Sequence, residues 1–221
     1  MKKQKPKKPT KSTQSAAARA DSRLELMGAA KKIFAEKGLD GASVKDIADE
    51  AGLNVSLVSY YFGGKDGLYR ACLEEFGRGR LETAQRILVS DIESIDDFRV
   101  RLRVFLEEFM EYHLAEPEIT RILHRDCSDN REVTKDLFKN VFLKLFGHLV
   151  NFFKIAQKKG FFREDVNTLI AAGQLFGGMI HTIRMESVIK EHMQISLSQK
   201  KHRDVFVNEI LKNLLEGVMK K

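Results

Sequence analysis

The sequence predicts an all-α protein with a three-helix N-terminal domain of the helix-turn-helix type, followed by a larger domain of roughly six helices. Apolar residues recur at helical spacing along nearly the whole chain. The 221 residues include only 3 prolines, and 43% are hydrophobic and 31% charged, so the chain has few of the turn-forming residues that folds with many strands need. Three short predicted helices come first, and the later ones are longer.

Caps and glycines bound the first two predicted helices. An apolar helical period starts behind Asp21 or Ser22 and ends at Gly38, where glycine suits the left-handed conformation that follows many helices. A second, shorter helix starts behind Ser43, with an acidic residue three positions on to complete a capping box, and ends at Gly52. We therefore expect two helices joined by a short turn.

The third predicted helix follows at once. Asn54 can cap it, and the pair Gly63-Gly64 ends it. Three helices in fewer than fifty residues, with glycine at the middle turn, are typical of a helix-turn-helix, here over residues 43–62.

The later helices are predicted from longer apolar periods. A capping box at Ser94–Asp97 starts one of them, and Pro117 suits the first turn of the next. The segment 128–160 leaves almost no polar face, so it is expected to run through the middle of its domain. The other predicted helices span about 66–89, 165–190 and 198–218.

The net charge of +7 is concentrated at the N-terminus. Residues 1–20 carry no acidic residue, and their seven basic residues account for the whole excess. With few apolar residues to bury, this segment is predicted to be a disordered basic arm. It is either a solubilising terminus or expression remnant, or an arm that binds nucleic-acid phosphates. The basic residues are Lys2, Lys3, Lys5, Lys7, Lys8, Lys11 and Arg19.

The cysteines and the hydropathy indicate a cytoplasmic protein. Cys72 and Cys127 lie outside any C-x-x-C pair, which argues against a disulfide framework and against a cysteine-based zinc site. The basic N-terminus has no apolar segment behind it, and no stretch approaches the roughly 18 uncharged apolar residues of a membrane-spanning helix. We expect no membrane partner, no metal and no cofactor.

The third helix is predicted to present a mixed polar and apolar face. On a helical wheel Val58 and Phe62 point to one side, which would pack on the other two helices, with Val55 and Tyr61 at its edges. Such a face can enter a DNA major groove, where hydroxyls reach base edges and an alkyl group meets a thymine methyl. The alternative is an ordinary surface helix with two serines. The outward residues are Ser56, Ser59 and Tyr60, with Leu57 beside them.

The three predicted helices and the start of the fourth, about residues 21–80, together resemble the TetR/AcrR family of bacterial regulators. Fixed apolar, glycine and aromatic positions agree across three helices and the start of the fourth. The matching motifs are Ala29-Ala30-x-x-Ile33-Phe34-Ala35-x-x-Gly38, Ser43-Val44-x-x-Ile47-Ala48-x-x-Ala51-Gly52 and Tyr60-Tyr61-Phe62-x-x-Lys65-x-x-Leu68.

The resemblance implies a sequence-specific transcriptional regulator, by the family's habit a repressor that binds a palindromic operator in double-stranded DNA as a homodimer. The chain departs from the family at Ser59, often a tyrosine, at Leu57, commonly threonine, and at Tyr61, commonly histidine. Residues 21–70 hold seven basic and eight acidic residues, so the arm would supply positive charge that this domain lacks. The positions matching the family's DNA contacts are Lys45, Val55, Ser56, Leu57, Ser59, Tyr61 and Lys65.

Residues 81–221 are expected to bind an effector and to form the dimer, as the second domain does in this family. Aromatic walls with a few polar groups are typical of ligand pockets, although ordinary core packing with satisfied histidines is the alternative. The effector would be small and largely apolar. The predicted pocket residues are Phe105, Phe109, Tyr112, His113, Phe142, Phe146 and His148, and the predicted interface residues are Gly173, Phe176, Gly177, Ile180, Phe206, Ile210 and Leu214.

Two other classes of protein were weighed. The run His124-Arg125-Asp126 with Asn130 looks like a kinase catalytic loop, but the asparagine is one position too close and no glycine-rich phosphate loop is present, so no enzyme is expected. A helical interaction protein that kept the fold and lost operator binding is the remaining alternative, because of Ser59 and Leu57.

Overall fold

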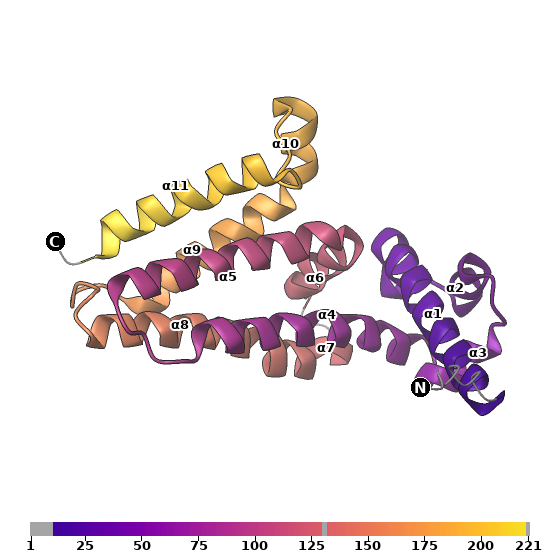
Figure 1. Ribbon diagram of the computed structural model, residues 1–221. Coiled ribbons are helices and arrows are strands. Elements are labelled where there is room, and N and C mark those ends of the chain that lie inside the picture. The colour runs from indigo at the N-terminus through magenta and orange to yellow at the C-terminus, as the bar shows by residue number, and fades with distance from the viewer. Residues whose placement is uncertain (1–10, 130–131, 220–221) are drawn as a thin grey trace, which may run out of the picture. The chain divides into compact units, whose positions relative to one another are not determined.

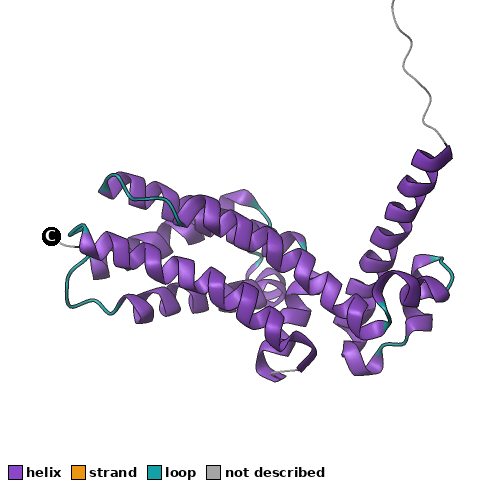
Figure 2. Ribbon diagram, turned by 90° about the horizontal axis from the view of Figure 1, so that it is seen from below, coloured by secondary structure: helices purple, strands orange, loops and turns teal. Residues whose placement is uncertain are grey.

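The computed structural model describes residues 11–129 and 132–219, and over this part of the chain the secondary structure is helical (Figures 1 and 2). The chain divides into two compact units. The boundary lies between Cys72 and Leu73, within α4 (Lys65–Leu88), and thus before the predicted boundary at residue 80. The all-α prediction is confirmed. None of the described helices is long and apolar enough to cross a bilayer.

Helix α1 (Lys11–Gly41) begins before the predicted start at residue 21. Residues 11–20 are therefore helical rather than disordered, because Ala16, Ala17, Ala18 and Arg19 are strong helix formers that continue the period of the following helix. Residues 1–10 of the predicted arm lie outside the described residues. Gly38 has φ 75° and ψ 173°, so the chain kinks at the predicted helix end.

Helix α2 (Val44–Ala51) has the predicted capping box: the Asp46 amide donates to Ser43 Oγ over 3.0 Å, and the Ser43 amide donates to Asp46 Oδ2 over 3.1 Å. Gly52 ends the helix with φ 65°. Asn54 Oδ1 accepts the Ser56 amide over 2.9 Å at the start of α3 (Ser56–Phe62). The three predicted caps and turns thus fix a helix-turn-helix.

Aromatic and aliphatic side chains from four helices form the core of the N-terminal unit. Phe34 of α1 meets Tyr69 of α4 edge to face, with ring centroids 4.8 Å apart, and Ile47 and Val58 are fully buried. Gly67 lets α4 start close to α3, because a Cβ there would collide with the Phe62 carbonyl oxygen. The turn between these two helices therefore depends on a glycine.

The C-terminal unit is a helical bundle, in which α8 packs on α9 and α11 lies against α5 and α9 (Figure 1). The loop after α8 turns back to the end of α11, where the Arg163 amide donates to the Val218 carbonyl over 2.9 Å. Besides the second part of α4, its elements are α5 (Ile95–Ala115), α6 (Pro117–Asp129), α7 (Glu132–Leu137), the π-helical turn η1 (Phe138–Phe142), α8 (Leu143–Lys158), α9 (Thr168–Arg184), α10 (Glu186–Met193) and α11 (Lys200–Val218).

The prediction of one helix over 128–160 that runs through the core was wrong in its first half. The segment is divided into the end of α6, α7, η1 and α8, and Phe138 and Leu143 are 39% and 51% exposed. Leu137 of α7 is buried, but the side chains of this segment join the main hydrophobic core from Leu145 onward, where Phe152 stacks on Phe98 of α5 at 4.9 Å between centroids. The extra residue of the π-helical turn shifts the apolar side chains around the helix axis, which a regular 3.6-residue period does not anticipate.

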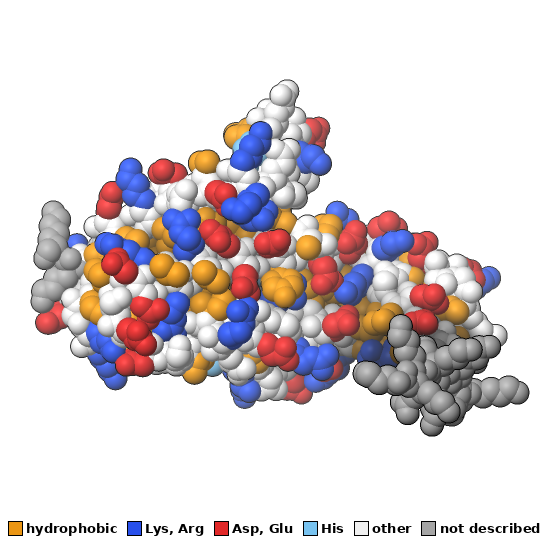
Figure 3. Space-filling view, in the orientation of Figure 1, with side chains coloured by type: hydrophobic (Ala, Val, Ile, Leu, Met, Phe, Trp, Pro, Cys, Tyr) orange, Lys and Arg blue, Asp and Glu red, His pale blue; other side chains and the backbone are white. Residues whose placement is uncertain are grey.

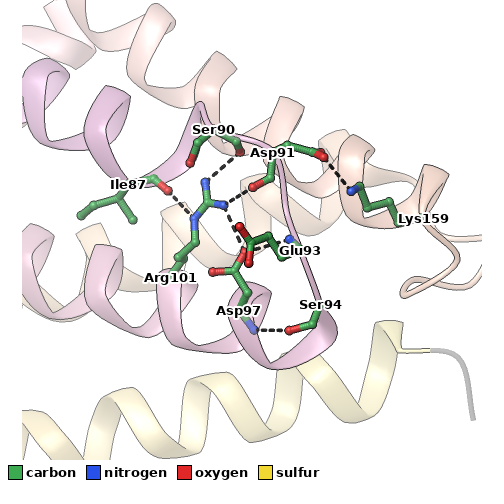
Figure 4. A network of polar contacts seen from close by, with 8 residues as sticks. All are labelled: Ile87, Ser90, Asp91, Glu93, Ser94, Asp97, Arg101 and Lys159. Carbon is green, nitrogen blue, oxygen red and sulfur yellow. Dashed lines mark hydrogen bonds and ion pairs between the residues drawn. The ribbon is translucent and has the colours of Figure 1, made fainter.

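Arg101 ties the loop between α4 and α5 to both helices (Figure 4). Its guanidinium donates to the carbonyl oxygens of Ile87, Ser90 and Asp91 over 2.7 to 2.9 Å. Only half of the predicted capping box at Ser94 is present: Ser94 Oγ accepts the Asp97 amide, whereas the Asp97 carboxylate accepts the Glu93 amide and binds Arg101. The carboxylate is drawn to the arginine, so the reciprocal bond of the box is not made.

Candidate nucleic-acid interface and effector cavity

The exposed face of α3 matches the face predicted from the wheel. Val58 is fully buried, whereas Ser56 and Ser59 are exposed and Tyr60 is 67% exposed. Phe62 is half-buried, with the Arg23 guanidinium 5.1 Å above its ring. An inward valine thus holds α3 to its unit, while two hydroxyls and a phenol face outward.

The edges of this face are apolar and aromatic. Val55 is exposed, Leu57 and Tyr61 are half-buried, and the Tyr60 and Tyr61 rings meet edge to face at 4.9 Å. An exposed ring pair next to short hydroxyls offers both hydrogen bonds and apolar contacts to a ligand surface. All of the residues predicted on α3 are therefore at least partly accessible.

The two lysines predicted to contact DNA differ in their surroundings. Lys45 of α2 is exposed, so its ammonium group is available to a phosphate. Lys65 is half-buried and donates to the Ala42 carbonyl oxygen over 2.9 Å. Lys65 therefore links the start of α4 to the turn before α2, a positioning role that the sequence pattern did not indicate.

Internal ion pairs balance the charge of the N-terminal unit. Lys32 pairs with Glu50 at 2.9 Å and Lys37 pairs with Asp46 at 3.0 Å. The hydrogen bond from Lys37, together with those from Ser43, lowers the pKa of the Asp46 carboxyl. Basic and acidic side chains are interspersed over the described residues on the face that Figure 3 shows, which agrees with the sequence count.

An apolar cavity of about 190 Å³ lies inside the C-terminal unit. Four of the seven predicted pocket residues line it: Phe109, His113, Phe142 and Phe146. These four residues come from three elements of the fold: Phe109 and His113 from α5, Phe142 from η1 and Phe146 from α8. Its remaining lining residues are Arg80, Leu123, His124, Phe138, Leu143, Leu145, Phe176 and Ile180.

His113 is an uncharged member of this wall. Its ring Nδ1 lies 2.8 Å from the Phe109 carbonyl oxygen, an acceptor, so Nδ1 carries the proton and Nε2 is a hydrogen-bond acceptor. Burial lowers its pKa to about 3, so the ring is neutral at neutral pH. The Phe109 and His113 rings lie 4.1 Å apart.

Three predicted pocket residues do not line the cavity. Phe105 is buried in the core beside Phe109, with ring centroids 5.9 Å apart. Tyr112 is 42% exposed and its ring covers the Arg80 guanidinium. His148 is half-buried on α8 and lies outside the lining set. Phe105 lies on the same face of α5 as Phe109 but one turn away along the helix, whereas His148, two positions from Phe146, points to another side of α8.

Six of the residues that line the cavity were not predicted for the pocket or for the interface: Arg80, Leu123, His124, Phe138, Leu143 and Leu145. The sequence pattern did not indicate that Arg80 is buried, because its burial depends on two aromatic rings from different helices. A second cavity, of about 620 Å³, is more polar and shares His113 and His124 with the first. Its charged lining residues are Arg121, Arg125, Arg184, Glu186 and Lys190.

The residues predicted for a dimer interface divide into two groups. Phe176 and Ile180 line the apolar cavity, and a Cβ at Gly173 would face Phe146 at 4.0 Å, so these three residues turn toward the interior. Gly177 is exposed, with no atom within 4 Å of an added Cβ. Phe206, Ile210 and Leu214 of α11 are half-buried against the core.

Metal ligation finds no support in the part of the chain that the structure describes, where no group of three or more His, Cys, Asp or Glu side chains could share an ion. The predicted site residues instead form an exposed helix face in the N-terminal unit and line an apolar cavity in the C-terminal unit.

Comparisons with known proteins agree with the helix-turn-helix of the N-terminal unit. The family profile described as "Bacterial regulatory proteins, tetR family" matches residues 26–72, which cover α2, α3, the second half of α1 and the first turns of α4. The chain is 28% identical over 120 residues to the probable HTH-type transcriptional regulator YttP of Bacillus subtilis, over 54% of this chain and 57% of that protein. It is 27% identical over 165 residues to the HTH-type transcriptional repressor NicS of Pseudomonas putida, over 71% of this chain and 74% of that protein.

Solved structures extend the fold likeness over nearly the whole chain. The ketosteroid transcriptional regulator KstR2 of Mycobacterium tuberculosis superimposes with a TM-score of 0.71, at 19% identity, over 90% of this chain and 95% of that one. The helix-turn-helix with its capping box and the profile match together identify residues 26–72 as a helix-turn-helix domain of the TetR family of bacterial regulatory proteins, and the solved structures agree with it in fold.

Proposed function

We propose that this protein is a repressor that binds a palindromic operator as a homodimer and is released by a small, largely apolar effector. The observation that carries the proposal is the face of α3, where Ser56, Ser59 and Tyr60 are exposed around a helix anchored by Val58. Seven residues of helix are short for one recognition element, so two copies related by a two-fold axis would read two half-sites. As a DNA-binding regulator, the protein acts in the cytoplasm.

The apolar cavity supports the effector half of the proposal. A wall of aromatic rings with a small number of polar groups is the usual character of small-molecule sites. Effector binding would favour a dimer conformation whose recognition helices no longer match the half-site spacing, which lowers operator affinity. Arg80, which lines the cavity, lies on α4. The first turns of the same helix belong to the N-terminal unit, so α4 runs from one unit into the other.

Selection from random duplex DNA tests the operator half directly. The proposal expects enrichment of a palindrome whose half-sites lie about one helical turn apart or somewhat more. Recovery of no enriched sequence would favour the alternative, a helical interaction protein that kept the fold without operator binding. A compound screen for release of the enriched DNA then tests the effector half.

The basic N-terminal segment is proposed to bind DNA phosphates. The five lysines among residues 1–10 precede α1, so replacing all five with glutamine leaves the described helix intact. Each phosphate contact contributes about 0.9 to the slope of log affinity against log salt, so loss of all five would flatten the slope by up to about 4.5 per subunit. An unchanged slope would contradict a role for the segment.

The dimer is proposed to form through α9 and α11. Gly177→Glu places a charged side chain where nothing in the subunit obstructs it, so it tests the interface without disturbing the fold. Gly147→Glu on α8, which is also exposed and also unobstructed, is the matched control. Light scattering after gel filtration should give a dimer for the control and a monomer for Gly177→Glu; a dimer in both would move the interface elsewhere.

A further inference from the structure

The apolar cavity contains one permanently charged side chain. Of the described residues that line it, Arg80 is the only arginine, lysine or carboxylate. The two histidines of the wall do not add to this charge, because burial lowers the pKa of His113 and of His124. A buried cation at the edge of an apolar space requires an explanation, since a charge without full pairing in such a place is costly.

Arg80 is held rigidly. It is 5% exposed, and its guanidinium carbon lies 3.6 Å from the centroid of the Phe76 ring and 4.1 Å from that of Tyr112. Nη1 donates to the Phe76 carbonyl oxygen over 2.9 Å and Nη2 donates to the Tyr112 carbonyl oxygen over 3.4 Å. The guanidinium plane is therefore fixed between two rings before any ligand arrives.

The pairing of this cation within the chain is incomplete. Its Nε is buried and has no hydrogen-bond partner among the described residues. The carboxylate of Glu116 comes only within 4.0 Å of Nη2, beyond hydrogen-bond distance. A guanidinium has five N–H donors, so besides Nε–H the second N–H of Nη1 and of Nη2 is left for a ligand, and such donors suit the oxygens of a carboxylate.

From this arrangement we propose that the effector is a small apolar carboxylic acid, bound as its anion, with the carboxylate against Arg80 and the hydrocarbon in the aromatic cavity. The proposal rests on the proposed function, because it names the chemical class of that effector. It assigns Arg80 as the residue that selects anionic ligands over neutral or cationic ones of the same shape.

The dimensions of the cavity limit the hydrocarbon. Cavities of about 150 Å³ lined by aliphatic and aromatic side chains take up benzene, so 190 Å³ accommodates about one six-membered ring or a chain of comparable bulk. Phe176 faces both Phe109 and Phe146, at 5.1 and 5.7 Å between centroids, and gives the space aromatic walls. Such rings pack well on a flat or flexible apolar group.

The π-helical turn η1 supplies the most exposed part of the wall. Phe138 and Phe142 face each other across this turn at 5.8 Å, and Phe138 and Leu143 are partly open to solvent. π-Helical turns occur frequently at functional sites, where the extra residue redirects side chains. Here the turn places an exposed phenylalanine beside the cavity, which is where a ligand would enter.

The test compares head groups on one hydrocarbon. The full-length wild-type chain is titrated calorimetrically with phenylacetate, 2-phenylethanol and 2-phenylethylamine, and with hexanoate, hexanol and hexylamine, at neutral pH. We expect one or both acids to bind at least tenfold more tightly than the matching alcohol, and the amines not to bind. Equal affinity for acid and alcohol in both series, or no binding of either acid, overturns the proposal.

Two variants locate the effect. Arg80→Gln should abolish the preference for acid over alcohol, whereas Arg86→Gln, a change to an exposed arginine on the same helix outside the cavity, should keep it. Because Arg80 is packed in the core, its variant can fail to fold; the head-group comparison on the wild-type chain needs no variant and still decides the matter. A folded Arg80→Gln protein that retains the full preference for acids would also overturn the assignment.

The outcome separates this proposal from the proposed function. If the selected operator is released by alcohols and acids alike, the repressor function stands and the carboxylate assignment fails. If acids bind with the expected preference but no operator can be selected, the carboxylate site stands and the repressor function fails.

Discussion

Gly67→Ala tests the packing that positions α3. The added Cβ would collide with the Phe62 carbonyl oxygen, at the end of the helix that carries the exposed face. Gly67 has no positive φ, so the conflict is steric rather than conformational. Because the obstacle is backbone rather than a flexible side chain, α4 or the end of α3 has to move.

The expected magnitude comes from two opposing contributions. Exchange of glycine for alanine inside a helix stabilises by up to about 1 kcal/mol. Overpacking against a fixed neighbour costs about 1 to 3 kcal/mol. We therefore expect Gly67→Ala to lower the free energy of unfolding by about 1 to 2 kcal/mol.

Gly79→Ala is the matched control on the same helix. Nothing lies within 4 Å of a Cβ at Gly79, so this substitution should raise the free energy of unfolding by about 0.5 to 1 kcal/mol. The measurement is urea denaturation of the full chain, followed by far-ultraviolet circular dichroism and fitted for separate transitions if the two units unfold independently. Equal effects of the two substitutions would refute the steric argument at Gly67.

Two further predictions concern the C-terminal unit. The pKa of His113 is lowered to about 3 by burial, so the unfolded chain binds a proton below pH 6.5 that the folded chain does not, and stability is lost as the pH falls. Between pH 7.5 and pH 5.5 this contribution should fall by about 1.3 kcal/mol, and the fall should be absent in His113→Gln; denaturation midpoints at the two pH values measure it, and the same slope in the variant would exclude His113 as its source. Arg101→Ala removes charge-assisted bonds to three carbonyl groups and should cost about 2 to 3 kcal/mol, whereas Arg99→Ala, which removes one exposed pair with Asp96, should cost less than about 0.5 kcal/mol. Similar thermal shifts for the two arginine variants would contradict the role assigned to the loop network.

Local chemistry made the N-terminal unit predictable. Ser43 and Asn54 cap their helices through neighbours two or three residues away, and Gly52 and Gly63 adopt the left-handed conformation that their positions demanded. The inward direction of Val58 followed from the helical period alone. Such features involve few residues, so they can be derived without knowing the fold.

The C-terminal unit was less predictable because its decisive features join distant segments. Arg80 lines the cavity because Phe76 and Tyr112 enclose it, and no spacing along the chain indicates that enclosure. Phe138 is exposed because a π-helical turn interrupts the regular period. Residues 11–20 were predicted to be disordered because of the basic charge of the N-terminal segment. They are helical, because their alanines favour helix.

The central claim, that the exposed face of α3 reads an operator, is tested most directly by repeating the DNA selection with a changed face. A Ser56→Ala, Ser59→Ala, Tyr60→Ala variant removes three outward groups and leaves the buried Val58 in place. We predict that the wild-type chain enriches a palindrome, and that the variant loses or changes this preference while it keeps salt-dependent, nonspecific binding. Enrichment of the same palindrome with the same affinity by both proteins would contradict the claim.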